Sequence, residues 1–476
     1  MLFDSFQFLF FFLAVTTLYF VLPFRVRWFL LLISSCYFYM AFVPIYILIL
    51  IFTIIIDYFA GIFIEGASGA KRKFFLICSL VANIGVLSFF KYYNFLSQNL
   101  NFLFHSFGLT TSVPYLQILL PIGLSFHTFQ AMSYTIEVYR GHEAAEKNFG
   151  IYSLYVMFYP QLVAGPIERP QNLLHQFRTK YPFDYDRIAD GLKMILWGFF
   201  KKIVIADRLA IYVNATYNHP QEHTGLTLTL ATFFFAFQIY CDFSGYSDIA
   251  IGSAKVMGFK LMTNFNRPYF AKNISEFWKR WHISLSTWFR DYLYISLGGN
   301  RVAVPRWYFN LFIVFLISGL WHGANWTYVL WGAINGFYLV FAIITHQLRS
   351  KLDKLTGLSK NPKLHKAFNI IITFLLSCFA WIFFRANNID DAFLIIKKVF
   401  TFKGPLFIQN PSMVIYSFTG IFILLFVDMK KEFYKGSFSF FNHQNWWVRN
   451  LSYATLVIII LLMGVFDGGQ FIYFQF

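Results

Sequence analysis

Long apolar runs recur along this sequence, and no other feature limits its fold as strongly. About twelve runs approach the roughly 20 apolar residues that a bilayer-spanning helix needs. Hydrophobic residues make up 58% of the chain and charged residues 13%, which is too little polar surface for a soluble protein of 476 residues. The sequence therefore predicts an all-α polytopic membrane protein with about 11–13 transmembrane helices. The runs lie at 6–24, 28–43, 44–64, 74–96, 115–138, 190–212, 226–251, 307–321, 324–346, 367–386, 412–428 and 449–466.

A further apolar run, at 149–166, is interrupted by Pro160, Gly165 and Pro166. Irregular backbone at membrane depth is tolerated only inside protein or beside a water-filled cavity. This run therefore predicts a re-entrant segment and an internal chamber. The sequence shows no internal repeat and no Gly/Ser linker, so we expect a single transmembrane domain over 1–476 and not the repeated halves of many transporters.

The formal net charge of +17 would suggest nucleic acid as the partner of a soluble protein. In a polytopic chain, Lys and Arg next to spans set the orientation in the membrane. We therefore expect contact with membrane lipid and no nucleic acid. Basic residues at 25–27 and 71–73 predict cytoplasmic loops, which places the N-terminus on the opposite side.

The hydrophilic stretch 255–306 contains one strongly periodic segment, at 276–294. Apolar side chains recur there every three or four positions and form one helical face. An amphipathic helix that is rich in Trp and flanked by Lys and Arg is typical of a membrane interface. The stretch is therefore predicted to be an interfacial segment. The residues of the apolar face are Phe277, Trp281, Leu285, Trp288 and Tyr292.

Two histidines are candidate catalytic residues. His282 lies in the amphipathic segment, and His322 follows the apolar run 307–321. An ionisable residue at membrane depth indicates a functional site, although a hydrogen-bonded core histidine is an equally ordinary explanation. Ser318 and Gly319 precede His322 by four and three residues, so they share its helical face and leave space for a substrate. A neutral imidazole at 322 would act as the general base for a hydroxyl that attacks a thioester.

Other chemistries find no support in the motifs. His282 and His322 are 40 positions apart, and no H-x-x-x-H spacing completes a metal site. There is also no P-loop, no dinucleotide fingerprint and no Gly-x-Ser-x-Gly elbow. The sequence predicts no metal and no bound cofactor.

Intramembrane carboxylates lie at Asp242 and Asp248, and neither can stay unpaired in hydrocarbon. They either pair with Lys or Arg from the 267–301 stretch or line the chamber. The aromatic C-terminal segment 467–476 leaves a similar choice. It either packs as a plug or presents the Tyr473 hydroxyl, which needs a base to become a nucleophile.

Several blocks of residues, in order along nearly the whole chain, resemble the membrane-bound O-acyltransferase (MBOAT) family. The resemblance is to the bacterial branch that acetylates alginate and related polysaccharides. The blocks are Pro121-Ile-Gly-Leu-Ser-Phe, Glu137-Val-Tyr-Arg-Gly, Phe158-Tyr-Pro-Gln-Leu-Val-Ala-Gly-Pro-Ile, Tyr240-Cys-Asp-Phe-Ser-Gly-Tyr-Ser-Asp, Phe265-Asn-Arg-Pro-Tyr, Glu276-Phe-Trp-Lys-Arg-Trp-His, Arg290-Asp-Tyr-Leu-Tyr-Ile and Gly319-Leu-Trp-His-Gly-Ala.

The resemblance implies a ring of helices around a central tunnel, with His322 as the catalytic histidine and His282 as a second signature position. Ser318, Asn325 and Asp242 become candidates for the tunnel lining. The C-terminal segment resembles the aromatic tail of envelope-acylating systems, which makes Tyr473 a candidate acyl relay. The chain departs from the family pattern at His127, where relatives more often carry an aromatic residue, and we assign it no role.

The implied function is transfer of an acetyl or other acyl group from acetyl-CoA, or another acyl thioester, to an exported alginate-like polysaccharide. The resemblance implies the bacterial inner membrane as the location and a separate SGNH-type acetyltransferase as the partner that acylates the polymer. Peptidoglycan O-acetylation and teichoic acid D-alanylation remain alternatives within the family. A transporter that exports acyl groups or glycans without catalysis is the alternative from another class.

Overall fold

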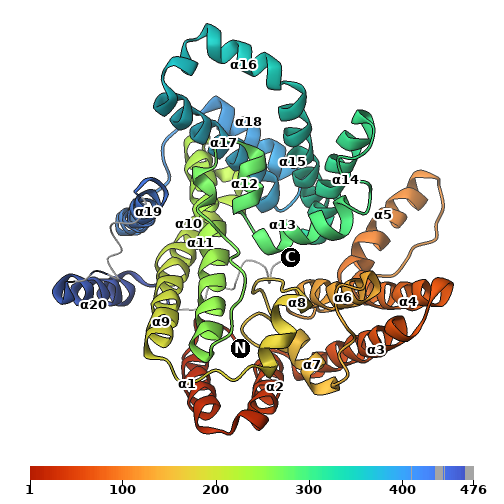
Figure 1. The fold of residues 1–476 in the computed structure, drawn as a ribbon. Coiled ribbons are helices and arrows are strands. Elements are labelled where there is room, and N and C mark those ends of the chain that lie inside the picture. Colours follow the sequence, from red (N-terminus) through yellow and green to blue (C-terminus); the bar gives the residue numbers. More distant parts are fainter. Residues whose placement is uncertain (409, 435–442, 444, 467–476) are drawn as a thin grey trace. The chain divides into compact units, whose positions relative to one another are not determined.

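The computed structural model describes residues 1–408, 410–434, 443 and 445–466. Every regular element within these ranges is a helix, as predicted (Figure 1). The chain divides into two compact units. Unit 1 comprises Met1–Ile195 and Tyr246–Met262, and unit 2 comprises Leu196–Gly245 and the described residues from Thr263 onward.

Unit 1 begins with apolar helices, most of them joined by short connections. Helices α9 (Tyr185–Phe199) and α11 (Gly225–Met257) each cross a boundary between the two units. The others in unit 1 are α1 (Phe6–Val21), α2 (Phe24–Met40), α3 (Ile47–Gly66), α4 (Gly69–Leu87), α5 (Tyr93–Ser106), α6 (Leu124–Arg140), α7 (Phe149–Met157) and α8 (Pro170–Leu173).

Unit 2 holds a buried core that is rich in aromatic residues, in which Trp281, Trp331 and Trp381 are almost fully buried. Three helices of this unit surround the site described below. The helices of this unit are α10 (Asp207–Tyr217), α12 (Ile274–Arg280), α13 (Ile283–Trp288), α14 (Val304–His322), α15 (Trp326–Ile344), α16 (His346–Leu355), α17 (Pro362–Arg385), α18 (Ile389–Thr401), α19 (Pro411–Phe433) and α20 (Trp446–Met463).

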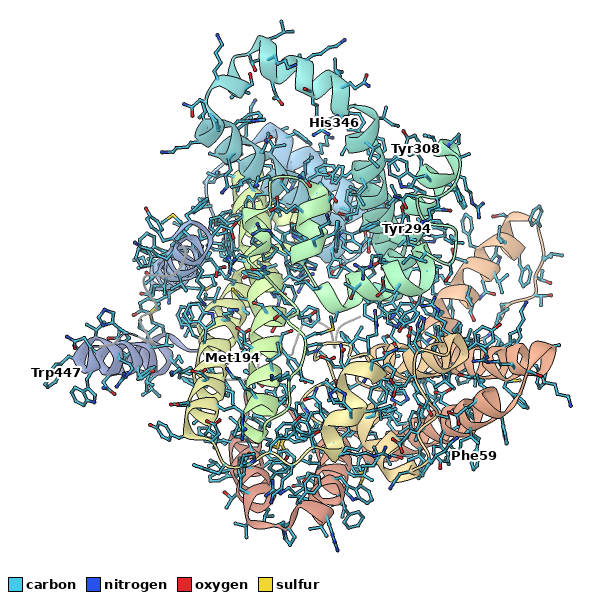
Figure 2. The ribbon with its side chains drawn as sticks, viewed as in Figure 1. Phe59, Met194, Tyr294, Tyr308, His346 and Trp447 are labelled. Atoms are coloured by element: carbon cyan, nitrogen blue, oxygen red, sulfur yellow. The ribbon has the colours of Figure 1, made fainter. Side chains whose placement is uncertain are left out.

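Eight helical runs among the described residues are long and apolar enough to cross a bilayer, and they confirm eight of the twelve predicted spans. Large apolar side chains such as Phe59 and Trp447 point outward from these helices, as they do in a protein that faces lipid (Figure 2). The chain is therefore a multi-pass membrane protein, whereas the ring and central tunnel stay predictions. The eight runs are Pro44–Gly66, Gly69–Ser106, Gly225–Met257, Val304–His322, Trp326–Ile344, Pro362–Arg385, Pro411–Phe433 and Trp446–Met463.

The other four predicted spans differ from the structure for local reasons. Helices α1 and α2 have only 16 and 17 residues. The run 115–138 is helical only from Leu124, because Pro121 has no amide to donate within a helix and disfavours helical backbone at Leu120. The run 190–212 stays helical, but it contains a π-helical segment, Phe200–Ala206, and this segment places two lysines within the run.

The predicted interruption at 149–166 is confirmed. Helix α7 ends at Met157, and residues 158–165 form turns with no regular helix. This irregular backbone is buried within unit 1, where the amide of Tyr159 donates to the hydroxyl of Ser35. Buried polar backbone atoms are therefore supplied with partners by the protein itself.

Helices α14 and α15 form an antiparallel pair whose backbones approach closely at two glycines. A Cβ atom at Gly319 would overlap the carbonyl oxygen of Tyr328, and one at Gly332 would overlap that of Phe315. Small residues at a membrane helix interface permit this kind of contact. The pair positions the end of α14, where His322 lies.

We expect Gly332→Ala to destabilise the protein by about 1–3 kcal/mol, because backbone atoms on both helices must move to admit the methyl group. Thermal unfolding of the purified protein in detergent measures the change. Gly85→Ala is the matched control, since Gly85 lies inside α4 and a Cβ atom added there would meet no other atom within 4 Å. Equal melting temperatures for the two variants would contradict the close approach.

Candidate functional site

His322 is the last residue of α14 and is buried, with 4% of its surface exposed. Aromatic rings from three helices surround the imidazole. The ring of Trp331 on α15 is perpendicular to the imidazole, with 5.0 Å between the two ring centres. The centre of the Phe384 ring on α17 lies 5.3 Å from that of the imidazole. The preceding Trp321 completes the surround at 4.9 Å. His322 is thus held in a buried, aromatic environment at the end of a membrane helix.

The glycines next to His322 have a different structural role from the one predicted. Ser318 is buried one turn before His322, on the face that the sequence indicated. Gly319 and Gly323, however, leave no open space, because a Cβ at either position would overlap Tyr328. They allow α14 to pack against the start of α15, and they do not provide room for a substrate.

Asn325 caps the N-terminus of α15. Its side-chain oxygen accepts from the amide of Thr327 at 3.0 Å, and its amide nitrogen donates to the carbonyl of Asn387 at 3.2 Å. Capping of this kind satisfies a backbone donor that a helix start would otherwise leave open. Asn325 therefore has a structural role in the turn after His322, while its place in a tunnel lining stays a prediction.

A row of tryptophans connects the surroundings of the two predicted catalytic histidines. Trp331, which contacts His322, stacks on Trp381 at 5.8 Å between ring centres. Trp381 in turn packs on Trp281 at 5.0 Å, and His282 follows Trp281 in the chain. The structure thus places both histidines in the same aromatic core of unit 2.

The single amphipathic helix predicted at 276–294 is wrong in its continuity. Helix α12 ends at Arg280, and His282 adopts a left-handed backbone conformation with φ of 43°. The chain then forms α13 and a π-helical segment, Phe289–Tyr294. The break is stabilised by a neighbouring segment, because the amide of Ile283 donates to the carbonyl of Asn264 and that of Asn266 to the carbonyl of Arg280. All five residues of the predicted apolar face are nevertheless buried.

The side chain of Asn264 fixes the proton on His282. Its oxygen accepts from the amide of Ser284 at 3.2 Å and from the Ser284 hydroxyl at 2.9 Å. Since a backbone amide can only donate, the atom that faces it is the oxygen of Asn264, and His282 Nδ1 must donate to that oxygen across 3.1 Å. The proton therefore sits on Nδ1, and Nε2 carries the basic lone pair.

Burial also keeps His282 neutral. The imidazole is 1% exposed, and desolvation holds the pKa of His282 well below its usual value of 6.5. The Phe243 ring packs nearly perpendicular to the imidazole, with 4.4 Å between the two ring centres. A neutral imidazole of fixed tautomer is the form that acts as a general base or as a fixed hydrogen-bonding group.

We expect Asn264→Leu to lower stability by about 1–3 kcal/mol and to slow acyl transfer, because three donors lose their shared acceptor. Ser284→Ala is the matched control, since it removes only one of the three hydrogen bonds. Melting temperature and transfer rate are measured on the same detergent preparations. If the two variants behave alike, Asn264 does not organise the turn at His282.

Asp242 is paired with a lysine that lies outside the stretch expected to supply its partner. The predicted partner from 267–301 is wrong, because Asp242 forms its ion pair with Lys202 Nζ at 2.9 Å. Lys202 also contacts Asp207 at 2.7 Å, and all three side chains are buried in unit 2. The missed signal was present in the sequence, since two adjacent lysines interrupt the apolar run 190–212.

The basic residues of the 267–301 stretch have other partners. Arg267 and Arg280 both bind the carboxylate of Glu432 on α19, at 2.9 and 3.0 Å, and Arg280 also binds Glu276 at 2.7 Å. Hydrogen bonds to Glu432 raise the pKa of Arg280 above its usual value, in spite of partial burial. This network joins the segment around His282 to α19.

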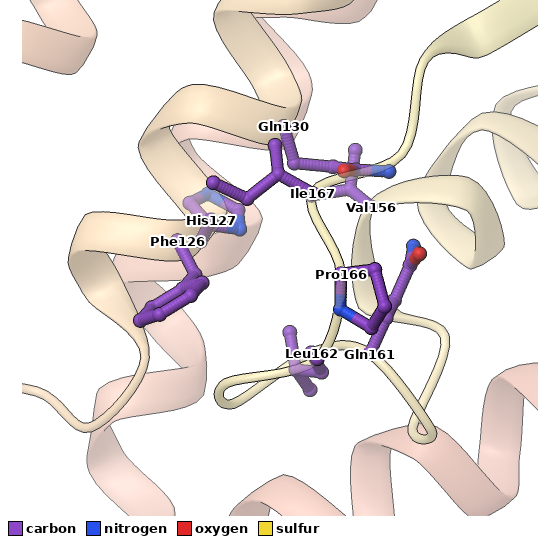
Figure 3. A pocket seen from close by; sticks show the side chains of 9 residues that line it. Phe126, His127, Gln130, Val156, Gln161, Leu162, Pro166 and Ile167 are labelled. Carbon is purple, nitrogen blue, oxygen red and sulfur yellow. The ribbon is translucent and has the colours of Figure 1, made fainter. Parts of the chain in front are cut away.

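A small pocket in unit 1 lies between α6 and the irregular segment after α7 (Figure 3). His127 on its wall forms a hydrogen bond through Nε2 with the hydroxyl of Thr53, and that hydroxyl donates to the carbonyl of Leu50. A hydroxyl has one proton, so His127 Nε2 is the donor of the pair. The amides of Gln130 and Gln161 both donate to the carbonyl of Tyr155. His127, where the chain departs from the family pattern, is thus a hydrogen-bonded residue on the wall of this pocket.

The relay candidate Tyr473 and the whole aromatic segment 467–476 lie outside the described residues, so the prediction for them stands as made. Within the described ranges, no group of three or more His, Cys, Asp or Glu side chains is arranged to hold a metal ion.

Comparison with known proteins identifies the family. The sequence profile of the membrane-bound O-acyltransferase family, MBOAT, matches residues 140–387. The probable alginate O-acetylase AlgI of Pseudomonas aeruginosa is 41% identical over 406 residues, which cover 84% of this chain and 75% of that protein. The peptidoglycan O-acetyltransferase of Helicobacter pylori is 32% identical over 477 residues, covering 90% of this chain and 88% of its own length. The teichoic acid D-alanyltransferase of Bacillus subtilis is 26% identical over 277 residues, covering 56% and 69%.

These matches agree with the motif blocks of the sequence. The profile range contains both His282 and His322, together with the segment 158–167 whose turns interrupt the helical pattern. The resemblance to the branch of alginate-acetylating proteins is confirmed as well. The chain is therefore an acyltransferase that spans the membrane several times, and it belongs to the membrane-bound O-acyltransferase family.

Proposed function

We propose that this protein transfers an acetyl group from a cytoplasmic thioester, across the bacterial inner membrane, for O-acetylation of an exported alginate-like polysaccharide. The observation that carries the proposal is the 41% identity with a probable alginate O-acetylase over 84% of this chain. The buried His322 at the end of a membrane helix supplies the chemical part of the argument.

His322 is assigned the role of general base. It removes the proton from an attacking hydroxyl while the oxygen bonds to the carbonyl carbon of the thioester. The carbon–sulfur bond then breaks, the thiolate leaves, and it takes up the proton from the imidazolium. The aromatic surround excludes water, so the thioester is protected from hydrolysis at the site.

The donor and the later acceptors belong to the same proposal. Acetyl-CoA or another acyl thioester is the donor, and the protein binds no resident cofactor. Tyr473 accepts the acyl group as a covalent relay, and an SGNH-type acetyltransferase outside the cytoplasm moves it to the polymer. His282, with its fixed tautomer, assists as the second histidine.

Two other acceptors remain as alternatives, each favoured by a relative. The peptidoglycan O-acetyltransferase is 32% identical over 90% of this chain, and the teichoic acid D-alanyltransferase is 26% identical over 56%. Both identities are lower than the 41% identity with the probable alginate O-acetylase. An alginate-like polymer is therefore favoured as the acceptor over peptidoglycan and teichoic acid. Family membership favours an acyltransferase over a transporter that forms no covalent bond.

The test is intact and peptide mass spectrometry of the purified full-length protein after incubation with isotope-labelled acetyl-CoA. We expect one labelled acetyl group on Tyr473 in the wild type and none in His322→Ala or Tyr473→Phe. Wild-type protein without an adduct would remove the relay, and direct transfer in one ternary complex would take its place. Label on Tyr473 in the His322→Ala variant would remove His322 as the base.

A further inference from the structure

Helix α16 is the most exposed of the helices described in unit 2. It joins the membrane-spanning helices α15 and α17, and none of its residues is buried (Figure 1). Its three leucines, Leu348, Leu352 and Leu355, expose 47–82% of their surface. Large apolar side chains in such a position cost free energy in water, so their surroundings need an explanation.

The leucines share one side of the helix, and basic residues border them. At 100° per residue, Leu348, Leu352 and Leu355 fall within an arc of about 60°. Arg349 and Lys351 flank this arc on its two sides. An apolar stripe with flanking basic residues is the pattern of a helix that lies in the plane of a membrane interface, where long basic side chains reach the headgroups.

Contacts with the two neighbouring helices fix which side of α16 faces the protein. Arg349 donates to the carbonyl of Ala342 near the end of α15. Asp353, on a different side of the helix from the leucines, forms an ion pair with His365 of α17 at 3.3 Å. The leucine side is therefore turned away from α17.

The leucine stripe also continues the lipid-facing side of α15. Phe337, Phe341 and Ile344 are exposed on α15 at spacings of four and three residues, and Leu348 follows after four more. A surface that faces hydrocarbon along α15 thus leads directly into the leucines of α16. His346, at the start of α16, marks the bend between the two helices in Figure 2.

The charge of the connection points to the same surroundings. Residues 346–366 contain six Lys or Arg and one acidic residue, Asp353. A short basic loop between two spans belongs on the cytoplasmic side, where the membrane surface carries anionic lipids. The leucines and the basic residues together therefore match the acyl region and the headgroups of one lipid leaflet.

We propose that α16 is a binding site for anionic phospholipids, with its leucines inserted in the cytoplasmic leaflet and its basic residues on the lipid phosphates. This site is separate from the residues assigned to acyl transfer, so the proposal does not depend on the proposed function. An acidic protein docked on the basic residues is the competing occupant. It would leave the leucine stripe without a partner.

The test uses the full-length protein in lipid nanodiscs with a fluorescent amino acid in place of Leu352. The control places the same amino acid at Ser350, on the opposite side of the helix. A nitroxide on the lipid acyl chain, near the headgroup, is the quencher. We expect quenching to be stronger at position 352 than at 350 by about twofold or more. Equal quenching at the two positions would overturn insertion of the leucines.

The charge part is tested in nanodiscs with and without phosphatidylglycerol. Quenching at position 352 is expected to rise with the anionic lipid in the wild-type background. The rise should disappear when Arg349→Gln, Lys351→Gln and Lys354→Gln are combined. A response that is the same in both backgrounds would overturn the headgroup site. The proposal would be overturned if lipid quenching at position 352 is weak and an acidic acyl carrier protein lowers the quenching at that position further. In that case α16 would bind a protein partner.

Discussion

His322→Ala is expected to abolish acetylation of the polymer while the amount of protein in the membrane stays unchanged. Loss of a general base lowers the rate of proton transfer by roughly 100-fold or more. The aromatic neighbours Trp321, Trp331 and Phe384 cannot replace it, because none of these three side chains takes up a proton at neutral pH. Acetyl content of the secreted polymer and immunoblots of the membrane fraction measure the two quantities.

Alanine at this position also leaves a cavity, so a second variant separates chemistry from packing. His322→Gln keeps a polar side chain of similar size and removes the base, and it should be equally inactive. His219→Ala is the matched control, since His219 is an exposed histidine of the same unit. Acetylation that persists in His322→Gln would show that the histidine serves structure and not catalysis.

Lys202→Met should cause the largest loss of stability of any single substitution considered, about 3–5 kcal/mol. The substitution removes the cation that the carboxylates of Asp207 and Asp242 share at 2.7 and 2.9 Å. Two buried carboxylates that approach the same point then repel each other more strongly, because the shared cation is lost. Yield of folded protein and thermal unfolding in detergent would register the loss.

The charge of the cluster can be restored in steps. Asp207→Asn and Asp242→Asn added to Lys202→Met should recover most of the lost stability, because the neutral cluster has no charge to solvate. Lys193→Met is the surface control, since the pair of Lys193 with Asp190 is partly exposed and contributes roughly 0–1 kcal/mol. Failure of the triple variant to recover would show that Lys202 acts through packing and not through charge.

Hydropathy predicted the elements whose environment is uniform along their length. The spans at 324–346 and 367–386 are continuous helices, because a helix satisfies the backbone donors and acceptors of an apolar run within its own segment. The prediction failed where a few polar residues or a proline change the local structure without lowering the mean hydropathy of the run. The segment before Leu124 lies between Pro114 and Pro121, and the run at 190–212 contains Lys201 and Lys202, yet both average as apolar.

Some features of the candidate site could likewise be predicted from the sequence, and others could not. The position of His322 at a helix end in a buried place followed from its own apolar run. The turn at His282 did not, because it depends on hydrogen bonds from Asn264, which lies outside the periodic segment. The need for a partner at Asp242 was also clear from the sequence. The choice of Lys202 was not, since it results from the way that α11 packs on the π-helical segment Phe200–Ala206.

The tryptophans between the two histidines give the core an optical signature of its own. Trp331 and Trp381 stack at 5.8 Å with an angle of 18° between their planes, and Trp331 touches the imidazole of His322. Near-ultraviolet circular dichroism arises from aromatic rings held in fixed, asymmetric surroundings and is lost when tertiary packing loosens. The spectrum of each purified variant therefore separates those that lost only a proton acceptor from those in which the indoles no longer hold their places.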